Sequence, residues 1–512
     1  MSKFKKSLGA YFTGSRRIKL TSDAMAALLI GVVIVINVIA FALTQAFSLY
    51  LFYPDEADLS LSGNTDALFA DEIADRDRVT VMFCQAEEDV RASSTGRFAL
   101  TTAENFRERY PELISIEFVN IITGRNSKNE FVDLSKYQTV DPVSNKPYPI
   151  YKTSVIFIDE INGRSKVLSD TTSEGYASFY TLDSSGASLS YNGEEMMAAM
   201  IQWVLKEEHK TAYFTTTHGE IADIGLGNML TAAGYEIDTV DLRRNNVPED
   251  AGLIVISNPV KDFARAMEGS NLDSEIERLR TYIENGGSVY VAIDPYVEKL
   301  HMLEGLLAEY GITISETESE GKIQRNIVHD SRNAITADSF TLVCELADGE
   351  YARSIADTVA KYSNNDVIQR ECAALTLSGK AEPILLSSSA SETYAGGTRT
   401  DNSGSYCIGA VGVFDNDKGE RGRVFVTSSI YLTATDALVT DGYANRPFIY
   451  ALAECVFDAD ELPYGCNTVY YNTETLENLT MGRARLYTAI IMTVPVSLAV
   501  VGAVVVIRRK YK

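Results

Sequence analysis

Two long apolar runs stand near the two ends of the 512-residue chain. The first, 24–46, contains no charged residue, and the second, 486–507, is interrupted only by Pro495. At about 1.5 Å per helical residue, each run is long enough to cross a hydrocarbon core of about 30 Å. Because proline is tolerated in membrane helices, we expect both runs to be transmembrane helices.

Between these runs, short apolar segments of strand length alternate with segments of helical periodicity. Residues 47–205 begin with the strand signal RVTVMF and end with the helical signal EEMMAAMIQWVLKEE, which predicts an α/β module of thioredoxin-like order. A thioredoxin-like protein would carry paired cysteines after the first strand. Here Cys84 stands alone, without a C-x-x-C pair.

Residues 206–320 have the most regular pattern of the chain. The strand signals TAYFTT, YEIDTVDL, GLIVISNP and SVYVAIDP are separated by helical segments, one of which carries Leu272, Ile276, Leu279 and Ile283 on a single face. Strands and helices that alternate with short turns predict a doubly wound parallel sheet, flavodoxin- or amidotransferase-like. Residues 321–480 are expected to be an α+β continuation. It ends the region between the two apolar runs with the strand signal RVFVTSSIYL and the helical signal RPFIYALAECVFD.

The predicted fold class is therefore an α/β ectodomain of tandem α/β modules between two transmembrane helices. The chain has 46 Lys and Arg against 70 Asp and Glu, a net charge of -24, which argues against a nucleic-acid partner. Bases nevertheless cluster in the tails 1–23 and 508–512, at Lys3, Lys5, Lys6, Arg16, Arg17, Lys19, Arg508, Arg509, Lys510 and Lys512.

This placement of Lys and Arg predicts the topology. Bases flank the cytoplasmic side of membrane helices, so we expect both termini in the cytoplasm and residues 47–485 outside the cytoplasmic membrane. A cleaved secretory signal ending near Ala46 is the alternative for the first run, and it leaves the middle region outside as well.

The six cysteines are too sparse for a disulfide scaffold, and free thiols are favoured. The four histidines lack metal-ligand spacing, so neither a metal site nor a cofactor is predicted.

Two turns carry the candidate site. His218, Gly219 and Glu220 follow the strand TAYFTT, and Asp294 and Pro295 follow SVYVAI. Open α/β sheets bind ligands at the carboxyl ends of their strands, where His218 could titrate and Glu220 could orient it. Structural roles explain the same residues: Gly219 for an unusual backbone angle, Glu220 for the helix dipole and Asp294 for the start of a helix. We therefore predict a ligand or partner site, without a catalytic residue.

The order of these segments resembles a known family. The segments are LSLSGNT…RVTVMF, TAYFTTTHGE, VPEDAGLIVISNP…YIENGGSVYVAIDP and RVFVTSSIYLT…NRPFIYALAECVFD. Together they resemble the GldG-like, or gliding-motility, auxiliary component of ABC-type transport systems. The family's strand ends in Gly-His-Gly-Glu, whereas Thr217 replaces the first glycine here.

The resemblance implies a non-ATPase membrane subunit that works with an ABC ATPase subunit and a multi-span permease. The sequence agrees in one respect, because it contains no G-x-x-x-x-G-K-[ST] loop to cradle nucleotide phosphates. Two alternatives remain. One is a membrane-anchored cell-envelope hydrolase acting through His218, Glu220 and Asp294, although the turn lacks the Ser or Cys of a nucleophile elbow. The other is a binding module for a glycan or peptide, which would need an apolar groove with exposed aromatic residues.

Overall fold

The computed structural model describes residues 59–69, 78–139, 147–169, 177–182, 188–221, 223–264, 274–319, 321–335, 339–401, 403–440, 442–459 and 462–471. The predicted membrane spans 24–46 and 486–507 and both basic tails lie outside these residues. Within the described residues, no helix combines the length and apolar character needed to cross a bilayer. All of them belong to one compact unit that begins at Asp58.

The first part of the chain forms a six-stranded sheet in the order β3-β2-β1-β4-β5-β6. β1 is buried along its whole length; it runs parallel to β2 and antiparallel to β4. The strands are β1 (Val79–Phe83), β2 (Ile114–Asn120), β3 (Arg125–Asn126), β4 (Val155–Asp159), β5 (Ser165–Ser169) and β6 (Ala177–Ser178). Among the described residues before α6, the helices are α3 (Asn64–Phe69), α4 (Glu87–Ala92), α5 (Gly96–Arg109) and the 3-10 helix η2 (Leu134–Tyr137).

Helix α6 (Gly193–Leu205) is buried on nearly every side. It packs against β4 and β5 of the first sheet and against α7 (Ile224–Ala232) of the second part. This explains its apolar sequence, because a helix covered all round has no polar face. A small sheet in the order β25-β8-β7 lies beside it, built from β7 (Tyr180–Leu182), β8 (Ser188–Tyr191) and β25 (Val469–Tyr470).

The second sheet begins with five parallel strands in the order β10-β9-β11-β12-β24. It continues antiparallel through β23, β20, β17 and β18. The parallel strands are β9 (Thr211–Thr215), β10 (Glu236–Val240), β11 (Ala251–Ser257), β12 (Ser288–Ala292) and β24 (Arg421–Thr427). The others are β17 (Thr341–Leu346), β18 (Val367–Arg370), β20 (Glu382–Leu386) and β23 (Cys407–Asp415).

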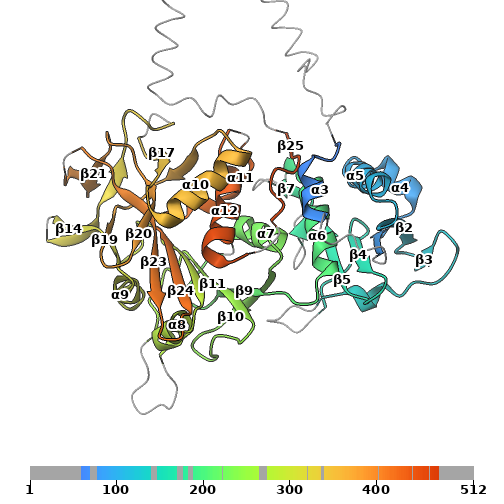
Figure 1. The fold of residues 1–512 in the computed structure, drawn as a ribbon, viewed down its shortest axis with the longest axis horizontal. Helices are drawn as coiled ribbons and strands as arrows, with labels where there is room; N and C mark the ends of the chain where they lie inside the picture. The colour runs from blue at the N-terminus through green and yellow to red at the C-terminus, as the bar shows by residue number, and fades with distance from the viewer. Residues whose placement is uncertain are drawn as a thin grey trace, which may run out of the picture. The chain divides into compact units, whose positions relative to one another are not determined.

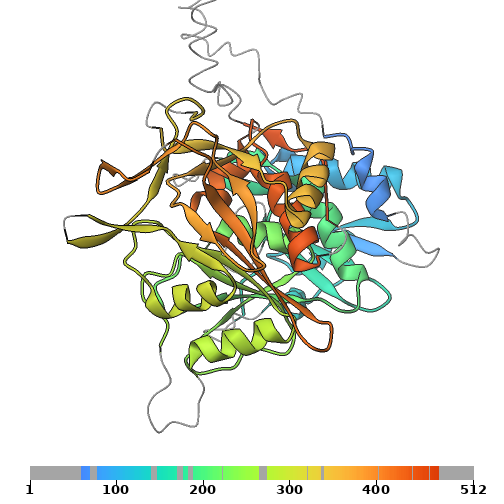
Figure 2. The ribbon, with the colours of Figure 1, turned by 60° about the vertical axis from the view of Figure 1, so that its left-hand side comes forward.

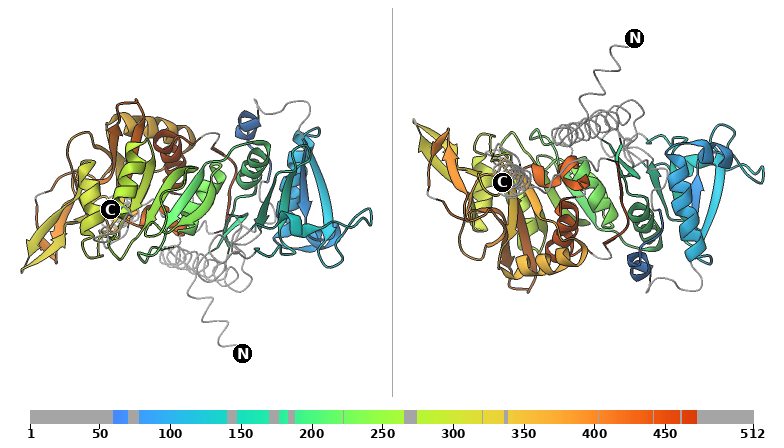
Figure 3. Two further views of the ribbon diagram at one scale, coloured as in Figure 1. Left: turned by 90° about the horizontal axis from the view of Figure 1, so that it is seen from below. Right: turned by 90° about the horizontal axis from the view of Figure 1, so that it is seen from above.

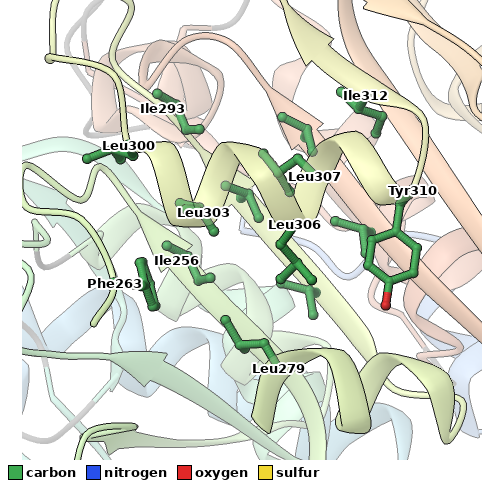
Figure 4. Close-up of a cluster of buried hydrophobic side chains, with 14 of the residues drawn as sticks. Ile256, Phe263, Leu279, Ile293, Leu300, Leu303, Leu306, Leu307, Tyr310 and Ile312 are labelled. Carbon is green, nitrogen blue, oxygen red and sulfur yellow. The ribbon is translucent and has the colours of Figure 1, made fainter. Parts of the chain in front are cut away.

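Helices cover both faces of the parallel strands. Ile254 and Ile256 of β11 share a core cluster with Leu279 of α8 (Glu275–Glu284) and Leu303 of α9 (His301–Glu309). Figure 4 shows Ile256, Leu279 and Leu303 in this cluster. On the opposite face, the Tyr290 ring of β12 contacts Phe425 and Phe457 of the strand β24 and the helix α12 (Asn445–Phe457). Strand residues that alternate between two covered faces are apolar throughout, which produced the continuous apolar signals in the sequence.

The α/β class is confirmed, and strands β17, β18, β20, β23 and β24 of the predicted continuation belong to the same sheet as β9–β12. The short strand β13 (Ile312–Ile314) lies outside the parallel strands and pairs antiparallel with β19 (Leu375–Leu377). The fifth parallel strand is β24, about 130 residues after β12 in the sequence. Helix α10 (Glu350–Tyr362) lies within the predicted α+β continuation, at a position for which no helix was specified.

Two antiparallel additions complete the described fold. β14 (Glu316–Ser319) and β15 (Lys322–Arg325) form a hairpin that projects from the sheet, as Figures 2 and 3 show. β16 (Ile327–His329), β21 (Glu392–Ala395) and β22 (Thr398–Arg399) form a three-stranded sheet. Two short elements, η3 (Tyr431–Thr433) and α11 (Thr435–Val439), connect β24 to α12.

Candidate functional site

The strand order reverses at β9, which has β10 on one side and β11 on the other. In open parallel sheets such a reversal opens a crevice at the carboxyl ends of the strands, where ligands bind. The predicted residues His218, Gly219 and Glu220 follow β9, directly at this reversal. The turn after β11, which contains Asn258 and Val260, lies beside them, because the Val260 and Lys261 amides both donate to the His218 carbonyl.

His218 lies between two carboxylates. Its Nδ1 is 2.8 Å from Glu220 Oε1, and its Nε2 is 3.1 and 3.2 Å from the two carboxylate oxygens of Glu275. The imidazole ring stacks on Phe263 with centroids 4.0 Å apart. The His218 side chain is only 4% exposed, and those of Glu220 and Glu275 are 7% and 2% exposed. Both ring nitrogens are therefore committed to carboxylates in a site largely closed to water.

The turn holds this geometry through its backbone. Thr217 and Gly219 both have positive φ angles, +88° and +78°. The Glu220 carboxylate also accepts a hydrogen bond from the backbone N–H of His218 at 2.7 Å, so Glu220 binds both the backbone and the side chain of His218. A Cβ on Gly219 would lie 2.4 Å from Val260 Cγ2, so glycine is required there both by its φ and by the close packing of the next turn.

The two carboxylates set the protonation of His218. Burial alone would lower its pKa, but the hydrogen bonds to Glu220 and Glu275 outweigh burial and raise the pKa to about 9. Burial also acts to raise the pKa of Glu220, yet the hydrogen bond from His218 leaves that pKa below its ordinary value. His218 is consequently a cation at neutral pH, held between two anions.

Asp294 and Pro295 follow β12 and have a different role. The Asp294 carboxylate accepts the Tyr296 amide at 2.8 Å, and its carbonyl accepts the Val297 amide. Asp294 thus shapes its own turn and is not among the hydrogen-bond partners of His218. Pro295 is buried in that turn. The structure therefore joins His218 to Glu220 but leaves Asp294 out of their network.

Two residues of this edge were not predicted. Glu275 lies in the segment whose apolar face predicts a helix, and its carboxylate accepts from His218 and from the Ala264 amide. Asn258 has a positive φ of +52°, is 6% exposed and has an Oδ1 without a hydrogen-bond partner in the described residues. An asparagine after a strand and beside a proline is usual turn chemistry, so no signal distinguished it.

The chemistry of a general base requires a neutral imidazole with a free nitrogen. Protonated His218, with a carboxylate on each nitrogen, meets neither condition. The arrangement can instead tie three segments together, since Glu220 comes from the turn after β9, Glu275 from α8 and Phe263 from the loop after β11.

Cysteine and metal chemistry offer no further centre in the described part of the chain. All six cysteines are free thiols, three of them buried. Burial raises the pKa of the Cys84 thiol to about 12, which leaves it without thiolate character at neutral pH. The described residues contain no cluster of His, Cys, Asp or Glu suited to hold a metal ion.

Comparisons with known proteins give no family. No family model and no curated protein matches the sequence. Among solved structures, the chain is similar to the "mmIFT52 N-terminal domain" at 15% identity, with a TM-score of 0.36 over 49% of this chain and 99% of that chain. A ThuA-like protein of Bacteroides uniformis follows at 12% identity and a TM-score of 0.30, over 50% and 94% of the two chains. PurLQS of Thermotoga maritima is 12% identical, with a TM-score of 0.25 over 48% and 99%. Scores this low carry no argument about function.

Proposed function

We propose that the protein is the non-ATPase auxiliary membrane subunit of an ABC-type transport system, with an extracytoplasmic α/β region that binds and couples and does not catalyse. In this proposal residues 24–46 and 486–507 span the cytoplasmic membrane, and both termini are cytoplasmic. An ABC ATPase subunit and a multi-span permease are the partners. The parallel strands are taken as a doubly wound, flavodoxin-like sheet, whose 2-1-3-4-5 order they share.

One observation carries the two-span arrangement: the two ends of the described region are clasped together. Asn467 donates through its side chain to the Ser60 carbonyl at 2.7 Å, and Asn64 donates to the Gly465 carbonyl at 3.0 Å. These pairs join positions about 400 residues apart in sequence. α3 and β25 accordingly lie near one another in Figure 1.

Glu194 is the centre of this clasp. Its carboxylate accepts the Ser62 amide at 2.6 Å, the Thr65 hydroxyl and the Asn467 amide at 2.6 Å. A buried carboxylate satisfied by three donors fixes the two ends to the first turn of α6. An ectodomain anchored at both ends by neighbouring helices needs its two ends close together, and the clasp meets that requirement.

The state of His218 favours coupling over hydrolysis. A hydrolase acting through His218, Glu220 and Asp294 needs a histidine that can accept a proton near neutral pH. The raised pKa of His218 and the absence of Asp294 from its hydrogen-bond partners weigh against that alternative.

Affinity purification of the full-length chain from its own cells tests the proposal. Membranes are solubilised in mild detergent, and the co-purifying proteins are identified by mass spectrometry. We expect an ABC ATPase and a multi-span permease to be enriched over an unrelated two-span protein carrying the same tag. The His218→Gln protein serves as the matched variant and should retain both subunits, because His218 has no catalytic role in the proposal. Recovery of the chain without either subunit would overturn it.

A further inference from the structure

A cavity of about 730 Å³ lies where the first part of the fold meets the second. Its walls come from β6, β7 and β8, from α6 and α7, and from α11 and α12. Small-molecule sites in proteins have volumes of about 300–1,000 Å³ and favour junctions between modules. The cavity is separate from His218, Glu220 and Glu275, none of which lines it.

One end of the cavity is polar, and its side chains are held in place by a network of hydrogen bonds. Arg446 donates through Nε and Nη2 to the two carboxylate oxygens of Glu195, and through Nη1 to Asn192 Oδ1 at 3.0 Å. Tyr450 also donates to Glu195, at 2.6 Å. The side chains of Glu195 and Arg446 are 4% and 13% exposed. A guanidinium carries five N–H groups, so these contacts leave one on each Nη to donate to a ligand oxygen.

The rest of the wall is largely apolar, with Met196, Met229 and Leu438 among its side chains. Methionine adapts its shape to a partner, which suits a pocket for a flexible chain. No aromatic ring is among the described side chains of the wall, so these side chains cannot stack on a sugar or a nucleobase.

The charges of the wall select against an anion. Arg446 is already paired with Glu195, and the second carboxylate, Asp436, is exposed at the wall. The local balance is thus negative, and an anionic head group would be repelled while an uncharged oxygen acceptor could still receive the spare N–H groups of Arg446.

We infer that this cavity binds a small uncharged amphiphile, a saturated chain or ring that bears a hydroxyl or carbonyl group. The oxygen accepts from Arg446, and the apolar body packs against Met196, Met229 and Leu438. The binding site itself does not depend on the transport proposal. A consequence for the membrane anchors rests on that proposal: Glu195 adjoins Glu194, so a ligand at Arg446 lies one residue from the clasp that holds the two ends of the described region together.

Photoaffinity labelling of the purified full-length protein in lipid nanodiscs tests the inference. The probe is an octanol that carries a diazirine, and labelled positions are mapped by peptide mass spectrometry. We expect saturable labelling of peptides containing Met196, Met229 or Leu438, and competition by unlabelled octanol. A diazirine octanoate, which is anionic, should label these peptides poorly. Equal labelling by the octanoate would overturn the uncharged class of ligand.

Variants separate the cavity from general partitioning. Ile224 lines the cavity yet is 57% exposed, so Ile224→Trp obstructs the space without repacking the core. Asn228→Phe is a second obstruction at a half-buried position. Ile221→Trp is the matched control, because Ile221 is 48% exposed and does not line the cavity.

Both obstructing variants should lose saturable labelling, and the control should keep it. Equal labelling of all three variants would overturn the site. Since the assay contains no transporter subunit, its outcome is independent of the copurification.

Discussion

At the scale of single residues, the carboxyl edge of the parallel strands is defined by buried charges that satisfy one another. His218 contributes stability only while it is a cation between Glu220 and Glu275. Its folded pKa, about 9, exceeds the ordinary 6.5. A group with a raised folded pKa gives its full stabilisation below the unfolded pKa and loses it as pH rises through the folded pKa.

We therefore predict a pH-dependent difference between the wild-type and His218→Gln proteins. Glutamine can still hydrogen-bond but carries no charge. The free energy of unfolding of the wild type should exceed that of the variant most at about pH 6, and the difference should shrink as pH rises from about 6.5 through about 9 and level off above that. Urea titrations followed by circular dichroism at a series of pH values measure it. A difference that stays constant across this range would contradict the prediction.

Thr217 and Gly219 form a matched pair for backbone strain. A β-branched residue at a φ of +88° is strained, and such strain costs about 1–3 kcal/mol. Thr217→Gly should thus raise the free energy of unfolding by about 1 kcal/mol. Gly219→Ala should lower it, because the new Cβ meets Val260. Thermal unfolding of the two variants beside the wild type tests both signs; a loss of stability in Thr217→Gly would show that the threonine hydroxyl matters more than its strain.

The sequence led to part of this site. His218 and Glu220 were found because they are two residues apart and follow an unmistakable strand. Glu275 was missed because it comes from another helix more than 50 residues later, and only the packing of α8 on the sheet brings its carboxylate to the imidazole. Local patterns name the residues of one turn, whereas their partners depend on tertiary contacts.

At the scale of elements, α6 joins the two parts of the fold through consecutive acids. In the sequence, Glu194 and Glu195 open the helical signal EEMMAAMIQWVLKEE. In the structure both are buried: Glu194 binds the two ends of the described region, and Glu195 binds Arg446 of α12. Helix α10 was not located from the sequence, although Tyr351, Ile355 and Val359 recur at helical spacing and are buried in the structure.

We predict that Arg446→Met destabilises the protein by about 3–5 kcal/mol, because it leaves the Glu195 carboxylate buried without its cation. Combining it with Glu195→Gln should recover part of the loss. Trp203, the only tryptophan, lies on α6, so its fluorescence during urea unfolding reports on this contact. Arg280→Met is the control, since Arg280 pairs with the half-exposed Glu277 and Glu309 and should cost only about 1 kcal/mol. Equal losses in the two variants would contradict a special role for the buried pair.

At the scale of the whole molecule, the sequence and the structure contribute different parts of one arrangement. The apolar runs and the basic tails predict two spans with both termini inside. In the proposed arrangement, the clasp between Ser60 and Asn467 would let both spans anchor one folded region, because it holds the two ends of the described region together. The sequence pattern does not reveal the contact between Ser60 and Asn467, because these residues are 407 positions apart. The structure does not test the two spans, because they lie outside the described residues.

The topology can be tested in intact cells with a membrane-impermeant maleimide. The half-buried Cys407, Cys455 and Cys466 are first replaced by serine, while the buried thiols are kept, since burial opposes their ionisation. A cysteine at Ile122, which is 91% exposed, should then react from outside. Cysteines introduced at Ser2 or Lys512 should react only after the membrane is permeabilised, because the basic residues around them predict that both tails are cytoplasmic. Reaction of either terminal cysteine in intact cells, with Ile122→Cys protected, would invert the orientation and remove the extracytoplasmic role of the α/β region.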